Sequence, residues 1–169
     1  MESMSELEKL AERLGAALLS RGESLVVAES CTGGWVGQAV TAVPGSSAWY
    51  ERCYITYSNT AKREMLGAQQ TTLDQYGAVS PQTAQEIAIG ALNRSHAHIS
   101  VSITGIAGPD GGTAEKPVGM VCFAWAAQEG LVQQETRYFT GDRETIRRQA
   151  VATALQGILR ILDNATAVA

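Results

Sequence analysis

The chain has 169 residues, of which 45% are hydrophobic and 18% are charged, a balance typical of one globular domain with a substantial core. Its net charge of −4 argues against electrostatic binding to nucleic acid or to an anionic membrane surface. The sequence contains no apolar run long enough to predict a membrane-spanning helix.

Residues 5–21 carry leucines at helical spacing and predict an amphipathic helix that begins with a capping box. An apolar run predicts a first strand over 24–29. A second helix is expected over 33–43, where a Pro-Gly pair ends it. The β-branched and aromatic content of 51–57 predicts the next strand.

A short helix is expected over 60–66, with Asn59 as its cap and a glycine at its end. Ser80-Pro81 is typical of a helix start, because serine caps the helix and proline occupies the first helical position. A third strand is predicted over 98–104.

A loop over 105–117 carries four glycines and two prolines. Segments 118–127 and 131–139 predict a hairpin that turns at a Glu-Gly pair, and a last helix is expected over 142–163. This order of elements predicts an α/β fold with a mixed β-sheet flanked by helices in three layers. No linker or repeat interrupts the chain, so we expect residues 1–169 to form a single domain.

Three polar clusters follow predicted strands: Ser30–Gly34, Tyr57–Lys62 and Thr104–Gly112. Ligand and catalytic sites of such folds gather where parallel strands end at their carboxyl side. The topology therefore predicts that the three clusters meet at one edge of the sheet.

The first cluster joins a strand to a helix. Ser30 at this turn is a candidate nucleophile, and the free N–H groups at the helix start would stabilise an oxyanion. Gly33 and Gly34 would let a ligand approach the backbone closely. The alternative is structural, with Ser30 or Thr32 only capping the helix. Cys31 is a rival nucleophile, although a buried structural thiol is the commoner fate of a cysteine.

A nucleophilic serine needs a base. His96 and His98 flank a helix-to-strand junction on the side opposite the predicted site, which argues against a Ser-His-Asp triad. Lys62 is the candidate base, and lowering its pKa from ~10.4 to near 7 requires roughly 4–5 kcal/mol of destabilisation of the ammonium. Partial burial beside Tyr57 would supply much of this destabilisation of the ammonium. The alternative is a solvated lysine on the helix surface, which is the fate of most lysines.

The glycines of Thr104–Gly112 suit a phosphate cradle or a substrate wall, but the segment matches neither a Walker A loop nor a dinucleotide fingerprint. A plain Gly/Pro-rich turn is the alternative. Thr104, at the end of its strand, is placed to hydrogen-bond Lys62 or a ligand.

Arg143 stands near a predicted helix start, where it would clamp a carboxylate or phosphate with two hydrogen bonds. The alternative is a surface ion pair, such as the one that Glu144 and Arg148 would form at helical spacing. Arg147 and Arg148 are expected to be solvated. No cysteine, histidine or carboxylate spacing predicts a metal site.

Four motifs occur in order along the chain. They are AESCTGG, YSNTAK at 57–62, SITGIAGPDGG with KPVG within 102–119, and GDR at 141–143. Together they resemble the CinA carboxy-terminal domain family over about residues 5–160, and within it the stand-alone nicotinamide mononucleotide amidohydrolases. The resemblance implies hydrolysis of the nicotinamide amide to a carboxylate, which releases nicotinic acid mononucleotide and ammonia without a metal or a cofactor.

The resemblance also implies roles for individual residues. Ser30 would be the nucleophile, Lys62 its base, Tyr57 and Thr104 would orient groups or relay protons, and Arg143 would contact the substrate. The predicted substrate-binding residues beside Arg143 are Cys31, Thr32, Gly33, Gly34, Gly105 and Gly108. The partners expected are a small nucleotide substrate and a second copy of the chain, because members of the family are commonly homodimers.

Two alternatives remain open at this stage. The same serine-lysine chemistry would serve an amidase for another small amide, and a non-catalytic nucleotide-binding or oligomerisation module is also compatible with the motifs. The start MESMSELEKLAERLG is charged and unlike a signal peptide, and three widely spaced cysteines do not predict disulfides. A reducing cytoplasm is therefore the expected location.

Overall fold

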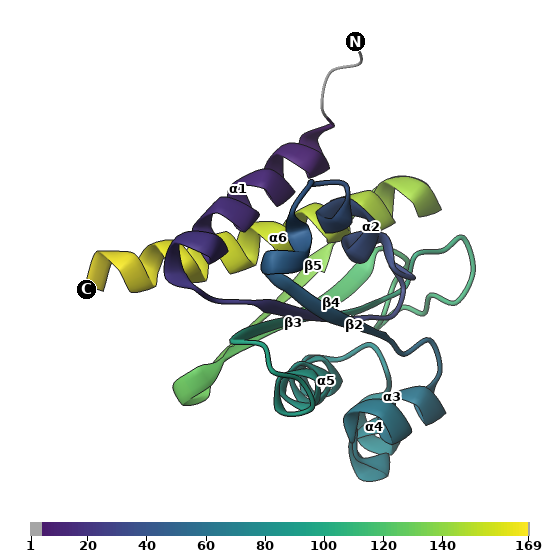
Figure 1. Ribbon diagram of the computed structural model, residues 1–169. Helices are drawn as coiled ribbons and strands as arrows, with labels where there is room; N and C mark the ends of the chain where they lie inside the picture. Colours follow the sequence, from purple (N-terminus) through teal and green to yellow (C-terminus); the bar gives the residue numbers. More distant parts are fainter. Residues whose placement is uncertain (1–4, 169) are drawn as a thin grey trace.

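The computed structural model describes residues 5–168, and side chains up to residue 165 (Figure 1). The single domain was expected to span residues 1–169, of which residues 1–4 and 169 lie outside the described residues. The elements in chain order are α1 (Glu6–Arg21), β1 (Leu25–Glu29), α2 (Trp35–Thr41), β2 (Tyr50–Ile55), α3 (Asn59–Leu66), α4 (Gln70–Tyr76), α5 (Pro81–Asn93), β3 (Ile99–Gly105), β4 (Met120–Ala127), β5 (Leu131–Tyr138) and α6 (Arg143–Val168).

The five strands form one mixed sheet in the order β2-β1-β3-β4-β5. Strand β1 runs parallel to both β2 and β3, whereas β4 and β5 continue the sheet as an antiparallel hairpin. The predicted mixed sheet is thus confirmed. Because β1, β2 and β3 are parallel neighbours, the polar clusters that follow them lie at the same edge of the sheet.

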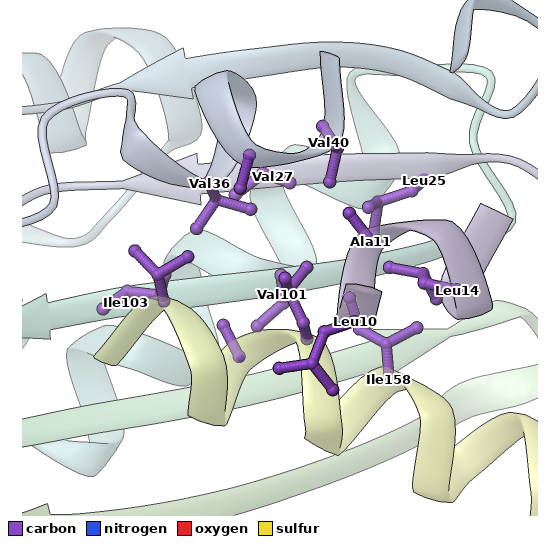
Figure 2. Close-up of a cluster of buried hydrophobic side chains, with 14 of the residues drawn as sticks. Leu10, Ala11, Leu14, Leu25, Val27, Val36, Val40, Val101, Ile103 and Ile158 are labelled. Carbon is purple, nitrogen blue, oxygen red and sulfur yellow. The ribbon is translucent and has the colours of Figure 1, made fainter. Parts of the chain in front are cut away.

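Helices cover both faces of the sheet, which confirms the three-layer α/β prediction. Helices α1, α2 and α6 lie on one face, and α3, α4 and α5 lie on the other (Figure 1). Alternate residues of β1 serve the two layers: Val27 packs under the first set of helices and Val26 under the second. Figure 2 shows the larger cluster, in which Leu14 and Ile158 approach the sheet residues from α1 and α6.

Some predicted boundaries moved. Strand β2 ends at Ile55, so Tyr57 lies beyond the strand that was expected to contain it. The predicted cap Asn59 is wrong, because the Ser58 hydroxyl accepts the hydrogen bond from the backbone N–H of Ala61 and α3 begins one residue earlier than expected. Serine and asparagine cap helices about equally well, so the sequence alone does not choose between adjacent candidates.

Helix α4 was not predicted. Its sequence QTTLDQY is mostly polar and contributes only Leu73 to the core. Contacts with α5 hold it in place: Glu86 accepts hydrogen bonds from the backbone N–H of Gln69 and from the hydroxyl of Thr72. Among residues 5–168, no helix combines the length and the apolar character that crossing a membrane requires.

Candidate active site

Ser30 occupies a tight turn between β1 and α2. Its backbone N–H donates to the Ile103 carbonyl at 3.1 Å, which holds the turn to strand β3. Its carbonyl accepts from the N–H of Gly33 at 3.0 Å and closes the turn. Gly33 and Gly34 have φ angles of +59° and +102°, a region that glycine adopts without strain. The two glycines therefore place α2 directly behind the serine.

Glu29, the residue before the serine, is fully buried and organises this turn. Its carboxylate accepts a 2.6 Å hydrogen bond from the Thr32 hydroxyl. It also accepts from the backbone N–H groups of Gly34, Val36 and Gly37 at 3.2, 3.0 and 3.1 Å. A carboxylate at a helix start is stabilised by the N–H groups and by the helix dipole.

The role of Glu29 was missed in the sequence. One signal in the sequence could have revealed it: Glu29 is a charged residue at the end of an otherwise apolar strand. A charge buried with such a strand needs several hydrogen-bond partners. The carboxylate uses N–H groups at the start of α2, which were expected to stabilise an oxyanion. It also accepts the hydrogen bond that the Thr32 hydroxyl donates.

Replacing Glu29 with glutamine is expected to lower the free energy of unfolding by about 2–4 kcal/mol, because an amide NH₂ would face donors that need an acceptor. Chemical denaturation measures the change. Glu51→Gln is the matched control, since Glu51 pairs with Arg52 in a salt bridge at the surface, and such pairs contribute little to stability. Equal losses in the two variants would contradict the anchoring role of Glu29.

Lys62 reaches the serine from α3. Its side chain is only 2% exposed, and its Nζ lies 3.0 Å from Ser30 Oγ. The same nitrogen donates a hydrogen bond of 2.7 Å to the carbonyl oxygen of Thr56. No carboxylate within residues 5–165 forms a salt bridge with it.

Burial lowers the pKa of the Lys62 ammonium below its usual value. A buried cation without a carboxylate partner loses its hydration and gains little in return. In the structure Nζ donates to both the Thr56 carbonyl and Ser30 Oγ, and a neutral amine at the same place has a lone pair that can accept the serine proton instead. The candidate nucleophile and the candidate base are thus in hydrogen-bond contact.

Cys31 lies beside the serine, but its thiol is poorly suited to act as the nucleophile. Burial raises the pKa of the Cys31 thiol to about 11. The thiolate, which is the reactive form, is therefore a minor species at neutral pH. Ser30, with a base at hydrogen-bond distance, is the better candidate.

Iodoacetamide is expected to alkylate Cys31 of the folded protein very slowly at pH 8, since a thiol of pKa about 11 is ionised to roughly one part in a thousand there. Peptide mass spectrometry resolves the rate at this residue. The rate should rise with pH toward 11, and denatured protein, in which the thiol is solvated, provides the fast reference. Rapid labelling of the folded protein at pH 7 would contradict the assignment.

A cavity of about 300 Å³ opens above the Ser30–Lys62 pair, at the lower end of the range for small-ligand pockets. Most of the predicted site residues line it: Ser30, Cys31, Tyr57, Lys62, Thr104, Gly105, Gly108 and Arg143. Thr32, Gly33 and Gly34 are not among the lining residues, so the geometry does not support their predicted substrate contact. Asn59 and Asp110 also line the cavity and were not predicted as site residues.

Tyr57 and Arg143 form the rim of the cavity. The Arg143 guanidinium donates to the Gly108 carbonyl at 2.8 Å and to the Tyr57 hydroxyl at 3.2 Å. Thr104 donates its hydroxyl proton to the carbonyl of Ala78 at 2.9 Å. Within the described side chains, neither Tyr57 nor Thr104 hydrogen-bonds Ser30 or Lys62, so the structure shows no contact for the proton relay expected of them.

Two arginines expected to be solvated behave differently. Arg148 is exposed and forms the predicted ion pair with Glu144 at 2.6 Å. The expectation for Arg147 is wrong: its guanidinium donates to the carbonyls of Cys31 and Thr32 at 3.0 and 3.1 Å. Sequence could not reveal this contact, because it joins residues more than 100 positions apart.

Both histidines lie away from the pair, as predicted. His98 Nδ1 accepts from the backbone N–H of Ser24 at 3.0 Å, at the end where β1 and β3 begin. His96 lines a separate cavity of about 570 Å³ beside the turn that joins β4 and β5. In that cavity Ser95 directs its hydroxyl to the Leu92 carbonyl at 3.2 Å, so it presents no serine-histidine pair.

Comparison with known proteins gives consistent matches over nearly the whole chain. A model of the CinA C-terminal domain matches residues 7–162. The nicotinamide-nucleotide amidohydrolase PncC of Escherichia coli (strain K12) is 54% identical over 154 residues, which cover 90% of this chain and 92% of that protein. The protein of the same name from Pseudomonas putida is 46% identical over 158 residues, covering 94% and 98%.

Longer relatives and solved structures also match. A CinA-like protein of Chloroherpeton thalassium is 44% identical over 160 residues, which cover 93% of this chain but 38% of that protein. The crystal structure of the competence/damage inducible protein CihA from Agrobacterium tumefaciens superposes with a TM-score of 0.91 at 46% identity, covering 96% of this chain and 99% of that chain.

Proposed function

The chain belongs to the CinA C-terminal domain family, and from this premise we propose that it hydrolyses the amide of nicotinamide mononucleotide to nicotinic acid mononucleotide and ammonia. Relatives about half identical to it carry the name nicotinamide-nucleotide amidohydrolase. We propose a serine-lysine mechanism with Ser30 as nucleophile and Lys62 as base, within the recycling of pyridine nucleotides.

The observation that carries the mechanism is the buried contact between Lys62 Nζ and Ser30 Oγ at 3.0 Å. Burial favours the neutral amine, which is the form that accepts a proton. The Thr56 carbonyl holds the amine beside the serine, where its lone pair would accept the serine proton once the amine is neutral. This is the arrangement that an activated serine needs: a base within hydrogen-bond reach and a third group that orients the base.

In the first half of the reaction, Lys62 removes the Ser30 proton while Oγ forms a bond to the amide carbon. The carbonyl oxygen becomes an oxyanion, which backbone N–H groups of the turn after Ser30 stabilise. The carbon–nitrogen bond then breaks, and the Lys62 ammonium returns its proton to the leaving nitrogen. Ammonia departs and leaves an ester between Ser30 and the nicotinoyl group.

In the second half, neutral Lys62 takes a proton from a water molecule, whose oxygen attacks the ester carbon. The carbon–oxygen bond to Ser30 breaks and the serine recovers its proton from Lys62. The products are a free carboxylate and the unmodified enzyme. Because Lys62 is restored in each half, the cycle requires no further acid or base.

Residues at the rim of the cavity suit the nucleotide part of the substrate. The exposed guanidinium of Arg143 is a cation that binds phosphate in a bidentate geometry. Gly105 and Gly108 also form part of the cavity wall, where the absence of a side chain leaves room for the ribose and phosphate. Asp110 lines the same wall, where a carboxylate accepts hydrogen bonds from ribose hydroxyls.

The test is an ammonia-release assay with nicotinamide mononucleotide, free nicotinamide and glutamine. We expect turnover of the mononucleotide and little of the other two, because only the mononucleotide offers a phosphate to Arg143. Turnover of another amide alone would place the chain among amidases of different specificity. Nucleotide binding, measured by calorimetry, without any ammonia release would support the non-catalytic alternative.

We propose that the protein works in the cytoplasm. Cys31, Cys53 and Cys122 are all free thiols, which suits a reducing cytoplasm. We also propose that the protein is a homodimer, because members of the family are commonly homodimers. Light scattering of the purified protein, which measures its molar mass in solution, distinguishes a monomer from a dimer.

A further inference from the structure

The two edge strands of the sheet, β2 and β5, are protected from pairing to different degrees. Strand β2 has six residues, and its register against β1 shifts between Leu25 and Val26, as it does at a bulge. Strand β5 has eight residues, contains no proline, and pairs with β4 in unbroken register. Native proteins shorten, bulge or interrupt an edge strand that must stay unpaired. The regular edge of β5 is therefore suited to pairing with another strand.

Alternate residues of β5 turn their backbone N–H and C=O groups away from β4. Phe139, directly after the strand, donates its N–H to the Gly119 carbonyl at 2.8 Å, so it faces the hairpin. The alternation of an antiparallel ladder then directs the groups of Tyr138, Thr136 and Gln134 to the open edge. Within residues 5–168, no other backbone segment hydrogen-bonds these groups. They are donors and acceptors that a further strand would use.

The helix layers leave this edge accessible. Helix α6 packs on β3 and β4, and α5 packs mainly on the same two strands from the other face of the sheet. On β5 itself, Tyr138 is 64% exposed and the side chain of Arg137 is 47% exposed. A second polypeptide therefore has access to the whole edge of β5.

The charges on β5 indicate which strand fits this edge. Glu135 and Arg137 are two residues apart, so their side chains share one face, which is the face that α6 covers. Glu135 contacts Arg160 of that helix at 3.1 Å and also pairs with Arg137. A strand that places an arginine opposite Glu135 and a glutamate opposite Arg137 would be complementary. A second copy of β5, running antiparallel, has this pattern.

A two-fold axis perpendicular to the sheet limits the registers in which two copies of β5 pair. In each register one residue lies at the axis, opposite its own copy. With Glu135 or Arg137 at the axis, like charges meet, which is destabilising. With Gln134 at the axis, neither charge meets an opposite one. With Thr136 at the axis, Glu135 of each protomer lies opposite the partner's Arg137.

We propose that the homodimer forms along this edge: two β5 strands pair antiparallel about Thr136 and continue the five-stranded sheet from one protomer into its partner. The inference rests on the proposed homodimer and assigns its interface. Each Glu135, already beside Arg137 and Arg160 of its own chain, gains the partner's Arg137, and charges in a network contribute more than isolated surface pairs. The exposed ring of Tyr138 lies opposite the partner's Gln134 and is partly covered.

Charge reversal tests this pairing. Glu135→Arg leaves two arginines on each strand and Arg137→Glu leaves two glutamates, so like charges meet in both homodimers. We expect the dissociation constant of each single variant, measured by analytical ultracentrifugation at low salt, to rise at least about tenfold. Added salt should reduce the difference from the wild type, because salt screens charges at the surface. Circular dichroism would confirm that both variants are folded.

Mixing the two single variants gives a sharper test. Arginines at positions 135 and 137 of one chain then face glutamates at the same positions of the other, so every opposing pair attracts. We expect a heterodimer whose dissociation constant lies within about threefold of the wild-type value, detected by native mass spectrometry and ultracentrifugation. A contact made only within one chain is not repaired by mixing, so recovery identifies a contact between chains.

Two further variants test the strand and the backbone. Arg52→Glu is the matched control, because it reverses a charge beside Glu51 on the other edge strand, β2, and it should leave the dissociation constant unchanged. Thr136→Pro removes an N–H that points away from β4, so the hairpin is retained. We expect this variant to be folded and monomeric.

The outcomes separate the interface from the assembly. A wild type that stays monomeric at every concentration tested would overturn the homodimer and its interface together. A wild-type dimer that tolerates both charge reversals and Thr136→Pro would uphold the homodimer and overturn the interface on β5. Single variants that dissociate but do not recover on mixing would overturn the register about Thr136.

Discussion

Ser30→Ala is expected to reduce ammonia release from nicotinamide mononucleotide by at least about 10³-fold, as loss of a nucleophile does in hydrolases. Cys31, the rival candidate on the same cavity, is not expected to replace it, because burial raises the pKa of its thiol to about 11. Ser30 is almost fully buried in a turn closed by backbone hydrogen bonds, so removing the hydroxyl leaves the turn intact. Thermal unfolding and circular dichroism would confirm that the variant is folded.

Cys31→Ser is the matched control for this variant. It changes the adjacent residue on the same cavity and exchanges a thiol for a hydroxyl of similar size. We expect it to keep most of the activity. Activity that survives in Ser30→Ala and disappears in Cys31→Ser would identify the thiol as the nucleophile and contradict the mechanism.

Lys62→Met is expected to lose activity by a similar factor while making the protein more stable. Methionine fills about the same space as the lysine stem and has no ammonium to bury. Removing the buried amine should raise the free energy of unfolding by about 1–2 kcal/mol at neutral pH. Residues that an enzyme needs for activity often lower its stability in this way. The double variant with Ser30→Ala should be no less active than either single variant, because the two residues act as a unit.

The pH dependence follows from the direction of the Lys62 pKa shift. The folded protein binds this proton more weakly than the unfolded chain, so the cost of burying Lys62 is complete below the lowered pKa. The cost declines as pH rises from that value to the ordinary lysine value of ~10.4, above which it is absent. The stability gain of Lys62→Met should decline over the same range.

The activity of the wild type should rise with pH through the lowered pKa of Lys62, since the amine must be neutral to accept the serine proton. Lys9→Met is the control, because Lys9 is an exposed residue of α1 far from the cavity. It should change neither activity nor the pH dependence of stability. A stability gain for Lys62→Met that is the same at every pH would contradict the buried, titrating amine.

Local patterns predicted much of the fold. The capping box of α1, the serine and proline that start α5, and the hairpin turn near Glu129 are contained in a few adjacent residues, and all are confirmed. The periodicity of apolar residues also identified which helix faces are buried. Helix α4 escaped prediction because its stability comes from contacts with α5 rather than from its own sequence.

The candidate site was also predicted only in part from the sequence. Serine at a strand-to-helix turn and lysine after the next strand were visible as motifs, and parallel strand order predicted that they would meet. Thr32, Gly33 and Gly34 were expected at the substrate but serve the turn, because the buried Glu29 draws this segment to itself. A pattern of residue types does not show which N–H groups are already used.

The sequence by itself determined the order of the five strands and of the α-helices other than α4, the two-sided sheet, and the residues that approach one edge of it. Only the tertiary structure decided the chemical state of those residues. The pKa of Lys62 depends on how completely distant segments of the chain exclude water from its amine. The turn that follows Ser30 is held by a hydrogen bond from Arg147 to the carbonyl of Cys31, which lies 116 positions earlier in the chain. Desolvation and long-range hydrogen bonds arise only when the chain has folded, so no local pattern contains them.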